Sequence, residues 1–241
     1  MEDNSILVVP QDWEYWNVRI SRLIVKQNAQ IIAVGALGAD NLTNAPDGKG
    51  RGKCERKGQI GNMGGPAPRG SDGGDAPNIT MQVGIQSIGS QVIDTSGGAG
   101  GYSGIAGRGG PGGRGSCNNR CNGMKGGTGG AGAVANGGHA GQVEFHYWFL
   151  NEEQPLRVEF ITDGGLAGPV SPGGPGGRGG ARKSCWPTRD RAAGKPGDVG
   201  ATPTPISRDR VRPIIVRYDE PTPGSFDAGS PFLPDYPPTE N

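Results

Sequence analysis

Glycine recurs at every third position through long stretches of this chain, and this period constrains the fold more than any other feature. The stretch GGAGGYSGIAGRGGPGGRGSC, from Gly97 to Cys117, contains glycine at each third residue from Gly98 to Gly113. A polyproline II helix has about three residues per turn, so every third residue lies on one edge of it. An edge made of glycine indicates that another backbone packs there without room for a side chain.

The same period recurs in separate stretches, which predicts several extended arms lying side by side. Flexible glycine-serine linkers keep no strict phase, and collagen needs long uninterrupted parallel chains. A disordered chain is the alternative, because glycine is 48 and proline 21 of 241 residues. We expect antiparallel arms packed within one chain. The predicted packing glycines are Gly98, Gly101, Gly104, Gly107, Gly110, Gly113, Gly123, Gly126, Gly129, Gly132, Gly138, Gly165, Gly168, Gly174 and Gly177.

The chain contains three copies of one unit. VIDTSGGAGGYSGIAGRGGPGGRGSC (92–117) and FITDGGLAGPVSPGGPGGRGGARKSC (160–185) both run from a β-rich stretch through GGPGGRG to Ser-Cys. IIAVGALGADNLTNAPDGKGRGKC (31–54) is a more divergent copy. We therefore predict a single domain over 1–220, with repeats at about 13–78, 79–142 and 143–205, a closing strand at 211–220 and a proline-rich tail at 221–241.

Each unit begins with a stretch typical of β-strands. WNVRISRLIVKQNAQIIAV, ITMQVGIQSIGSQVID and QVEFHYWFLNEEQPLRVEFITD alternate apolar with polar residues and are rich in Val, Ile and aromatic residues. Glycine and proline interrupt nearly every window that could form an amphipathic helix. The predicted fold class is all-β plus polyproline II. It combines a small β-sheet of about six or seven strands with three glycine-rich polyproline II arm pairs packed as a bundle, and no significant α-helix.

The four cysteines, Cys54, Cys117, Cys121 and Cys185, predict structural disulfides and an oxidising location. Four thiolates binding zinc are the alternative, although the chain has no CxxC pair. We favour one disulfide between Cys117 and Cys121 within a tip and one between Cys54 and Cys185 joining two tips. Sequence leaves the two other connectivities open.

The charge balance argues against a general nucleic-acid binder, since 24 basic and 23 acidic residues give a net charge of +1. Arginines within the glycine-rich runs, such as Arg108 and Arg178, leave an RGG-like RNA contact as an alternative. No apolar stretch is long enough for a membrane span. The start, MEDNSILVVPQDWEYW, has neither a basic n-region nor an apolar h-region. We expect an extracellular location, or one at a cell or virion surface, without such a signal peptide.

Motifs that would indicate catalysis are missing from the sequence. Neither of the two histidines lies in a nucleophile, zinc or phosphate-loop motif. We therefore expect no enzyme, no cofactor and no metal centre. DNLTNAPDGKG, which contains Asp40 and Asp47, could ligate calcium, and a polar turn explains it as well. Asn41 and Asn78 fit the N-x-[ST] glycosylation pattern.

Aromatic residues gather in two places, near the start of the chain and in the third unit. Such clusters form either a small core under the sheet or a contact with another subunit or a glycan. The candidate interface residues are Trp13, Tyr15, Trp16, Tyr147 and Trp148.

The glycine-rich arms resemble those of polyglycine-II bundle proteins, a group that includes the snow-flea antifreeze protein and the tail-tip adhesins of T-even-like phages. The succession of strand, GGxGGxG arm and cysteine tip is also similar to bacterial glycine-rich proteins described as collagen-like. The resemblance covers residues 31–203, is one of period and composition, and implies a rigid bundle. It carries over no binding residue. Side chains such as Arg108 and Lys125 on the arms argue against a flat ice-binding face.

These patterns predict a structural role. We expect a subunit that self-assembles into an extracellular filament, sheath or surface layer, through strand addition and polyproline II packing. Such contacts would give a helical homo-oligomer. The alternative is an adhesin of a phage or bacterial surface, whose arm tips bind a glycan or a cell-surface receptor. We expect no nucleic-acid partner.

Overall fold

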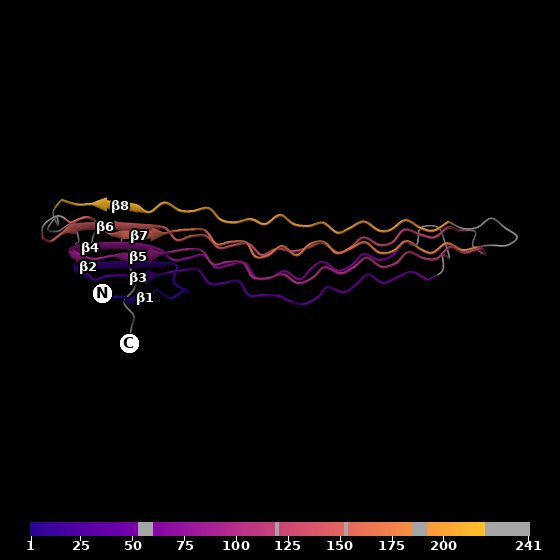
Figure 1. Ribbon diagram of the computed structural model, residues 1–241, viewed down its shortest axis with the longest axis horizontal. Coiled ribbons are helices and arrows are strands. Elements are labelled where there is room, and N and C mark those ends of the chain that lie inside the picture. The colour runs from indigo at the N-terminus through magenta and orange to yellow at the C-terminus, as the bar shows by residue number, and fades with distance from the viewer. Residues whose placement is uncertain (53–59, 119–120, 152–153, 185–191, 220–241) are drawn as a thin grey trace, which may run out of the picture.

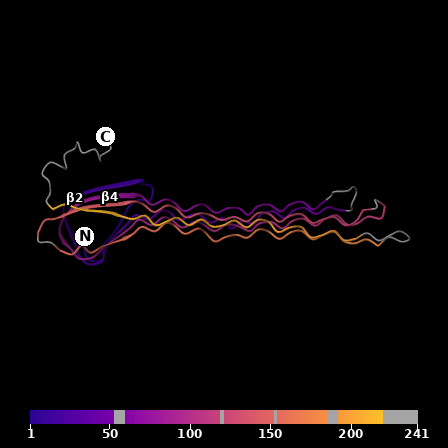
Figure 2. The same ribbon diagram turned by 90° about the horizontal axis from the view of Figure 1, so that it is seen from above.

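The computed structural model describes residues 1–52, 60–118, 121–151, 154–184 and 192–219. The molecule is elongated, with strands gathered at one end and long extended segments running side by side to the other end (Figure 1). The view from above shows the same arrangement (Figure 2). The described residues contain no helix, which confirms the predicted absence of α-helix.

The strands form two sheets of four. Their orders are β1-β3-β5-β7 and β2-β4-β6-β8, and neighbouring strands in both are parallel. The strands are β1 (Ile6–Val8), β2 (Tyr15–Val25), β3 (Ala29–Ile32), β4 (Asn78–Ile88), β5 (Gln91–Asp94), β6 (Val143–Phe149), β7 (Val158–Ile161) and β8 (Ile214–Arg217). The prediction of one sheet with about six or seven strands is therefore corrected to two sheets with eight strands in total among the described residues.

Short turns explain the second sheet. The turn from β2 to β3 passes through Asn28, whose φ of 56° lies in the left-handed region that Asn tolerates. This turn carries the chain across to the other sheet instead of closing a hairpin. Each strand then pairs with its counterpart in the next repeat, so that the chain forms stacked coils.

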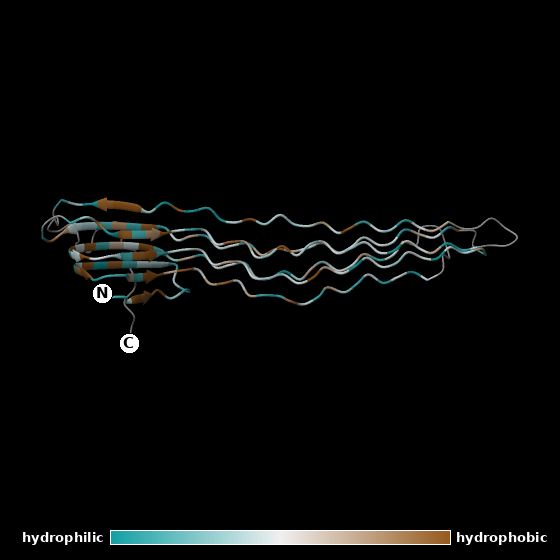
Figure 3. Cartoon of the chain, viewed as in Figure 1, coloured by the Kyte–Doolittle hydropathy of each residue, from teal (hydrophilic) through white to brown (hydrophobic). Residues whose placement is uncertain are grey.

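The hydrophobic core lies between the two sheets, where alternate residues of each strand point inward. Ile79, Met81 and Val83 of β4 are at most 1% exposed, and Phe145 of β6 and Ile93 of β5 are fully buried. Apolar colour concentrates in the strands, while the long segments are mostly pale or polar (Figure 3). The sandwich therefore supplies most of the hydrophobic stabilisation, which is proportional to buried apolar area.

The long segments are six glycine-rich arms. Three leave the ends of β3, β5 and β7, and three lead back into β4, β6 and β8. The outgoing arms 1 to 3 cover residues 33–52, 95–116 and 162–184, and the return arms 1 to 3 cover residues 60–77, 121–142 and 192–213.

Two buried threonines join outgoing arms to return arms at the end of the bundle next to the sandwich. The Thr95 hydroxyl donates to the Gly141 carbonyl at 3.0 Å, and the Gly141 N–H donates back to the Thr95 carbonyl at 2.9 Å. Thr162 exchanges the same pair of bonds with Val211 in the next coil. Both threonines are fully buried, and these bonds satisfy polar groups that burial would otherwise destabilise.

Backbone hydrogen bonds connect the arms at every third residue. Along one edge of outgoing arm 2, five glycines donate to carbonyls of return arm 1 at 2.8–3.0 Å. The pairs are Gly98 with Gly74, Gly101 with Ser71, Gly104 with Pro68, Gly107 with Gly65, and Gly110 with Asn62. The same glycines also face outgoing arm 1, where a Cβ added to Gly104 would lie 1.8 Å from the Thr43 carbonyl oxygen. The neighbours of this edge thus belong to the same chain.

Replacing a packed glycine by alanine should destabilise the bundle. A Cβ on Gly129 would lie 1.7 Å from the Gly174 carbonyl oxygen, so Gly129→Ala must push two backbones apart. Overpacking of this kind costs about 1–3 kcal/mol, and we expect a lower Tm in calorimetry. Gly52→Ala is the matched control, since nothing lies within 4 Å of its added Cβ. Equal melting temperatures for the two variants would contradict the packing described.

Candidate functional site: the open edges of the sandwich

The sandwich ends on two sides in strands that have no neighbour on their outer flank among the described residues. The N-terminal edge consists of β1 and β2, and the C-terminal edge consists of β7 and β8. Such strands present rows of N–H and C=O groups to which a further strand can bond. Figure 1 shows the two pairs on opposite sides of the sandwich.

Strand β1 exposes apolar residues at this edge. The Val9 N–H donates to the Ile32 carbonyl at 2.8 Å, so odd-numbered residues turn their backbone toward β3. Backbone groups of successive residues point to opposite flanks of a strand in a parallel sheet, so those of Ile6 and Val8 face outward. Their side chains are 59% and 63% exposed. The short strand thus presents apolar residues and backbone groups together.

The C-terminal edge also presents outward-facing backbone groups together with apolar residues. The Tyr218 N–H donates to the Tyr147 carbonyl at 2.8 Å, so even-numbered residues of β8 face β6, and the backbone of Ile215 faces outward. Ile215 is 47% exposed. In β7, Ile161 pairs with β5 through its carbonyl, so the neighbouring Phe160 turns its backbone to the open flank.

The first predicted aromatic cluster lies at the N-terminal edge. Trp13 and Tyr15 are 46% and 57% exposed, whereas Trp16 is partly buried and packs against the core. The Glu14 carboxylate hydrogen-bonds the Tyr15 hydroxyl and repels its ionised form, and both effects raise the pKa of Tyr15. Acidic and aromatic side chains therefore stand together at the start of β2.

The second predicted cluster is not an exposed interface. Tyr147 is 8% exposed, and its ring packs against Phe145 and Phe149 at centroid distances of 5.7 and 5.5 Å. Trp148 is 5% exposed and lies across Gly84, where an added Cβ would come within 2.9 Å of the indole Nε1. Burial of these two side chains corrects the expectation that they contact a partner.

Carboxylates in the segment that could ligate calcium instead accept hydrogen bonds from the backbone of a neighbouring arm. Asp40 accepts the N–H of Tyr102 at 2.8 Å, and Asp47 accepts that of Arg108 at 2.7 Å. The segment is therefore part of outgoing arm 1 rather than a turn. Within the described ranges, no group of three or more His, Cys, Asp or Glu residues is placed to hold a metal ion.

Return arm 1 carries the same kind of contact, which the sequence analysis missed. Asp72 accepts the N–H of Asn136, and Asp75 accepts that of His139, both at 2.6 Å. The Asn136 hydrogen bond lowers the pKa of Asp72, and Arg69 adds to this effect. A signal is present in the sequence, because these aspartates lie three residues apart within a glycine-rich arm.

The tip between outgoing arm 2 and return arm 2 carries two cysteines. Cys117 and Cys121 are both disulfide-bonded, and Ser116 and Cys121 exchange two backbone hydrogen bonds at 2.9 and 3.1 Å. Cys54 and Cys185 lie outside the described residues, so the preferred connectivity stays a prediction.

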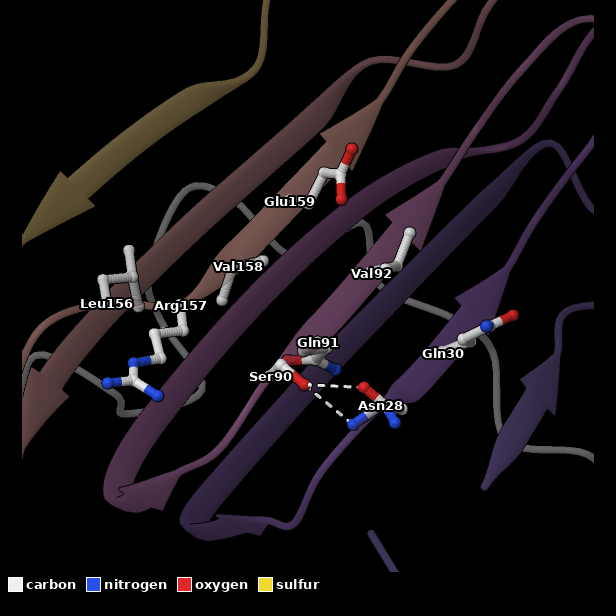
Figure 4. A pocket seen from close by; sticks show the side chains of 9 residues that line it. All are labelled: Asn28, Gln30, Ser90, Gln91, Val92, Leu156, Arg157, Val158 and Glu159. Carbon is white, nitrogen blue, oxygen red and sulfur yellow. Dashed lines mark hydrogen bonds between the residues drawn. The ribbon is translucent and has the colours of Figure 1, made fainter. Parts of the chain in front are cut away.

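A shallow hollow lies on the sheet β1-β3-β5-β7, near the starts of β3, β5 and β7 (Figure 4). Its lining includes Asn28, Ser90, Arg157 and Glu159. The Asn28 N–H donates to the Ser90 hydroxyl oxygen at 2.8 Å. Among the described lining residues there is no histidine that could serve as a base for Ser90, so the hollow offers hydrogen-bonding groups rather than a nucleophile and its base.

No helix long and apolar enough to cross a membrane occurs in the part of the chain that the structure describes.

Comparison with known proteins assigns no family to the chain. No family model and no curated protein matches the chain, so neither supports the similarity to bacterial collagen-like proteins. One similar solved structure is a springtail antifreeze protein from Granisotoma rainieri, a bundle of nine polyproline type II helices on which crystal waters match the ice lattice. It is 22% identical, covers 69% of this chain and 93% of its own, and has a TM-score of 0.15. That score supports no argument about fold or function.

The Asp72 contact predicts a stability difference that depends on pH. Because its pKa is lowered in the fold, the charged carboxylate stabilises the fold at neutral pH. That contribution is lost as the pH falls below the ordinary value of 3.8 and through the lowered one. We expect the Tm of Asp72→Ala to lie below that of the wild type at pH 7, with the gap shrinking below pH 3.8.

Asp209→Ala, at an exposed position, is the matched control. A gap between wild type and Asp72→Ala that stays constant from neutral to acidic pH would show that the charged hydrogen bond contributes nothing.

Proposed function

We propose that the protein is a structural subunit that self-assembles head to tail into an extracellular filament, sheath or surface layer. One observation carries the proposal: among the described residues, the stacked coils stop on both sides at open strand edges of both sheets. The N-terminal edge of one copy can therefore continue the C-terminal edge of another. Such a contact joins two different surfaces, so it propagates rather than closes unless rotation completes a ring.

The geometry of the sheets supports strand addition. Neighbouring strands are parallel, and each sheet contributes one edge strand on either side. A second copy can thus add β1 to β7 and β2 to β8 with a single displacement. Four strand positions at about 4.8 Å each correspond to an advance of roughly 19 Å per subunit.

The arms act as a rigid projection in this proposal. We take them to be polyproline II helices, because their N–H donors and their glycines recur at every third residue. All described arms run from the same end of the sandwich, so an assembly would carry the bundles along one side (Figure 2). Disulfide-bonded Cys117 and Cys121 support an oxidising, extracellular setting.

An adhesin is the second candidate, and the position of the tip favours it. The turn between Cys117 and Cys121 lies at the far end of outgoing arm 2 and return arm 2, away from the sandwich. A glycan or a cell-surface receptor could bind there. Exchanging the residues between these cysteines would then change binding on a glycan array while leaving self-association unchanged.

Self-assembly can be tested at β1. Val8→Pro removes an N–H that faces the open flank and leaves the bonds to β3 intact, and edge strands tolerate proline. We expect the wild type to form filaments in electron microscopy and to show concentration-dependent light scattering. Val8→Pro should remain monomeric with a similar Tm.

Val8→Thr keeps the N–H and the branched shape, so it should assemble like the wild type. A wild type that remains monomeric at every concentration, with its disulfides intact, would refute the proposed assembly.

A further inference from the structure

The register of one sheet relates the two open edges to each other. Tyr15 pairs with Asn78, whose side chain accepts the N–H of Gln142 at 2.8 Å. The Gln142 side chain in turn donates to the Arg212 carbonyl at 3.1 Å. Tyr15 and Arg212 therefore lie at the same level along the strands, on opposite sides of the molecule.

Opposite charges stand at this level. On the N-terminal edge Asp12, Trp13, Glu14 and Tyr15 are all exposed. On the C-terminal edge return arm 3 enters β8 through the sequence Arg-Asp-Arg-Val-Arg, residues 208–212. One edge is thus acidic and aromatic, and the other is rich in arginine.

Two of these arginines are accessible. Arg210 and Arg212 are exposed, and the ion pair of Arg210 with Asp163 at 3.2 Å leaves 63% of the arginine side chain exposed. An exposed pair of this kind stabilises a fold only slightly, so the guanidinium can turn to another partner at little cost.

We infer that Arg210 and Arg212 of one subunit dock on the surface formed by Asp12, Trp13, Glu14 and Tyr15 of the next. The inference rests on the proposed head-to-tail assembly and names the contact that sets its register. When β2 of the next subunit continues the sheet beyond β8 in register, Arg212 lies beside Tyr15, and Arg210 lies beside Trp13. A guanidinium can then stack on the indole face and bond to the adjacent carboxylates.

Apolar residues agree with the same register. In the other sheet Leu7 of the incoming β1 falls beside Phe160 of β7, because both positions align through β3 and β5. Leu7 is 43% exposed and Phe160 is partly buried, so the contact removes apolar area of both from water. Ile215 of β8 likewise falls beside Val18 of the incoming β2.

The contact is confined to the sandwich and to the end of return arm 3 that enters β8. Strands β1 and β2 are joined directly by residues 9–14, without the arm pair that separates β3 from β4. Beside this first coil there is consequently no arm to pack against a neighbouring bundle. Pairing of strands and charges, rather than packing of arms, therefore selects the partner.

Charge reversal on each edge tests the inference. Variant one carries Arg210→Glu and Arg212→Glu, and variant two carries Asp12→Arg and Glu14→Arg. Each variant alone brings like charges together, and we expect its critical concentration for assembly to rise about tenfold or more. Mixed in equal amounts, the two variants offer complementary edges at every contact. We expect the mixture to assemble near the wild-type concentration, in alternating order.

Controls separate this inference from the proposed function. Arg51→Glu with Arg178→Glu changes exposed charges on the arms and should leave assembly unchanged. Melting curves verify that each variant folds. A wild type that never assembles refutes the proposed function itself. If the wild type assembles but both charge-reversal variants assemble equally well alone, or if mixing restores nothing, the arginine docking is wrong while strand addition stands.

Discussion

The structure depends on direct hydrogen bonding between arm backbones at positions where no side chain intervenes. Glycine loses more backbone freedom on folding than any other residue, so these arms are costly to order. Little buried apolar area compensates within the bundle, where Ala67, Ala106 and Ala133 form a small cluster of their own. The rows of backbone bonds, with aspartates such as Asp40 and Asp72 accepting additional N–H groups, hold the arms together.

The sandwich organises those bonds. Its parallel strands place each outgoing arm beside the outgoing arm of the next coil, and each return arm beside the next return arm. Buried Thr95 and Thr162 hydrogen-bond outgoing arms to return arms just beyond the ends of β5 and β7. A hydrophobic core of ordinary type thereby sets the alignment of a bundle that could not establish it from its own repetitive sequence.

Within the described part of the chain, the same coiled arrangement leaves the terminal strands of both sheets without an outer neighbour. A solenoid in which each coil contacts its neighbours needs some cover on its terminal coils, or it joins another copy. Here β1 and β8 expose apolar residues, and charges of opposite sign stand at matching levels of the two edges. These features connect the fold to the assembly that we propose. The arm bundles of successive subunits would then project along one side of that assembly.

Much of the local structure could be predicted from the sequence, because it depends on short-range patterns. The absence of helix follows from frequent glycine and proline, and the strands follow from alternating apolar residues. The cluster around Tyr147 could not be assigned in this way. An alternating strand shows that its two faces differ, but not how the chain turns and which faces another sheet covers.

What the sequence determined by itself is the repeating unit: strand residues, then glycine at every third position, then a cysteine-bearing tip. Tertiary structure decided which neighbour each position meets. Gly132 and Gly138 have the same phase in the sequence, yet the N–H of Gly132 bonds to return arm 3 and that of Gly138 bonds to outgoing arm 2. Likewise, alternating strands fit one sheet or two equally well. In both cases the neighbour is determined by contacts between segments that are far apart in the sequence. A period along the chain does not specify which distant segments come into contact.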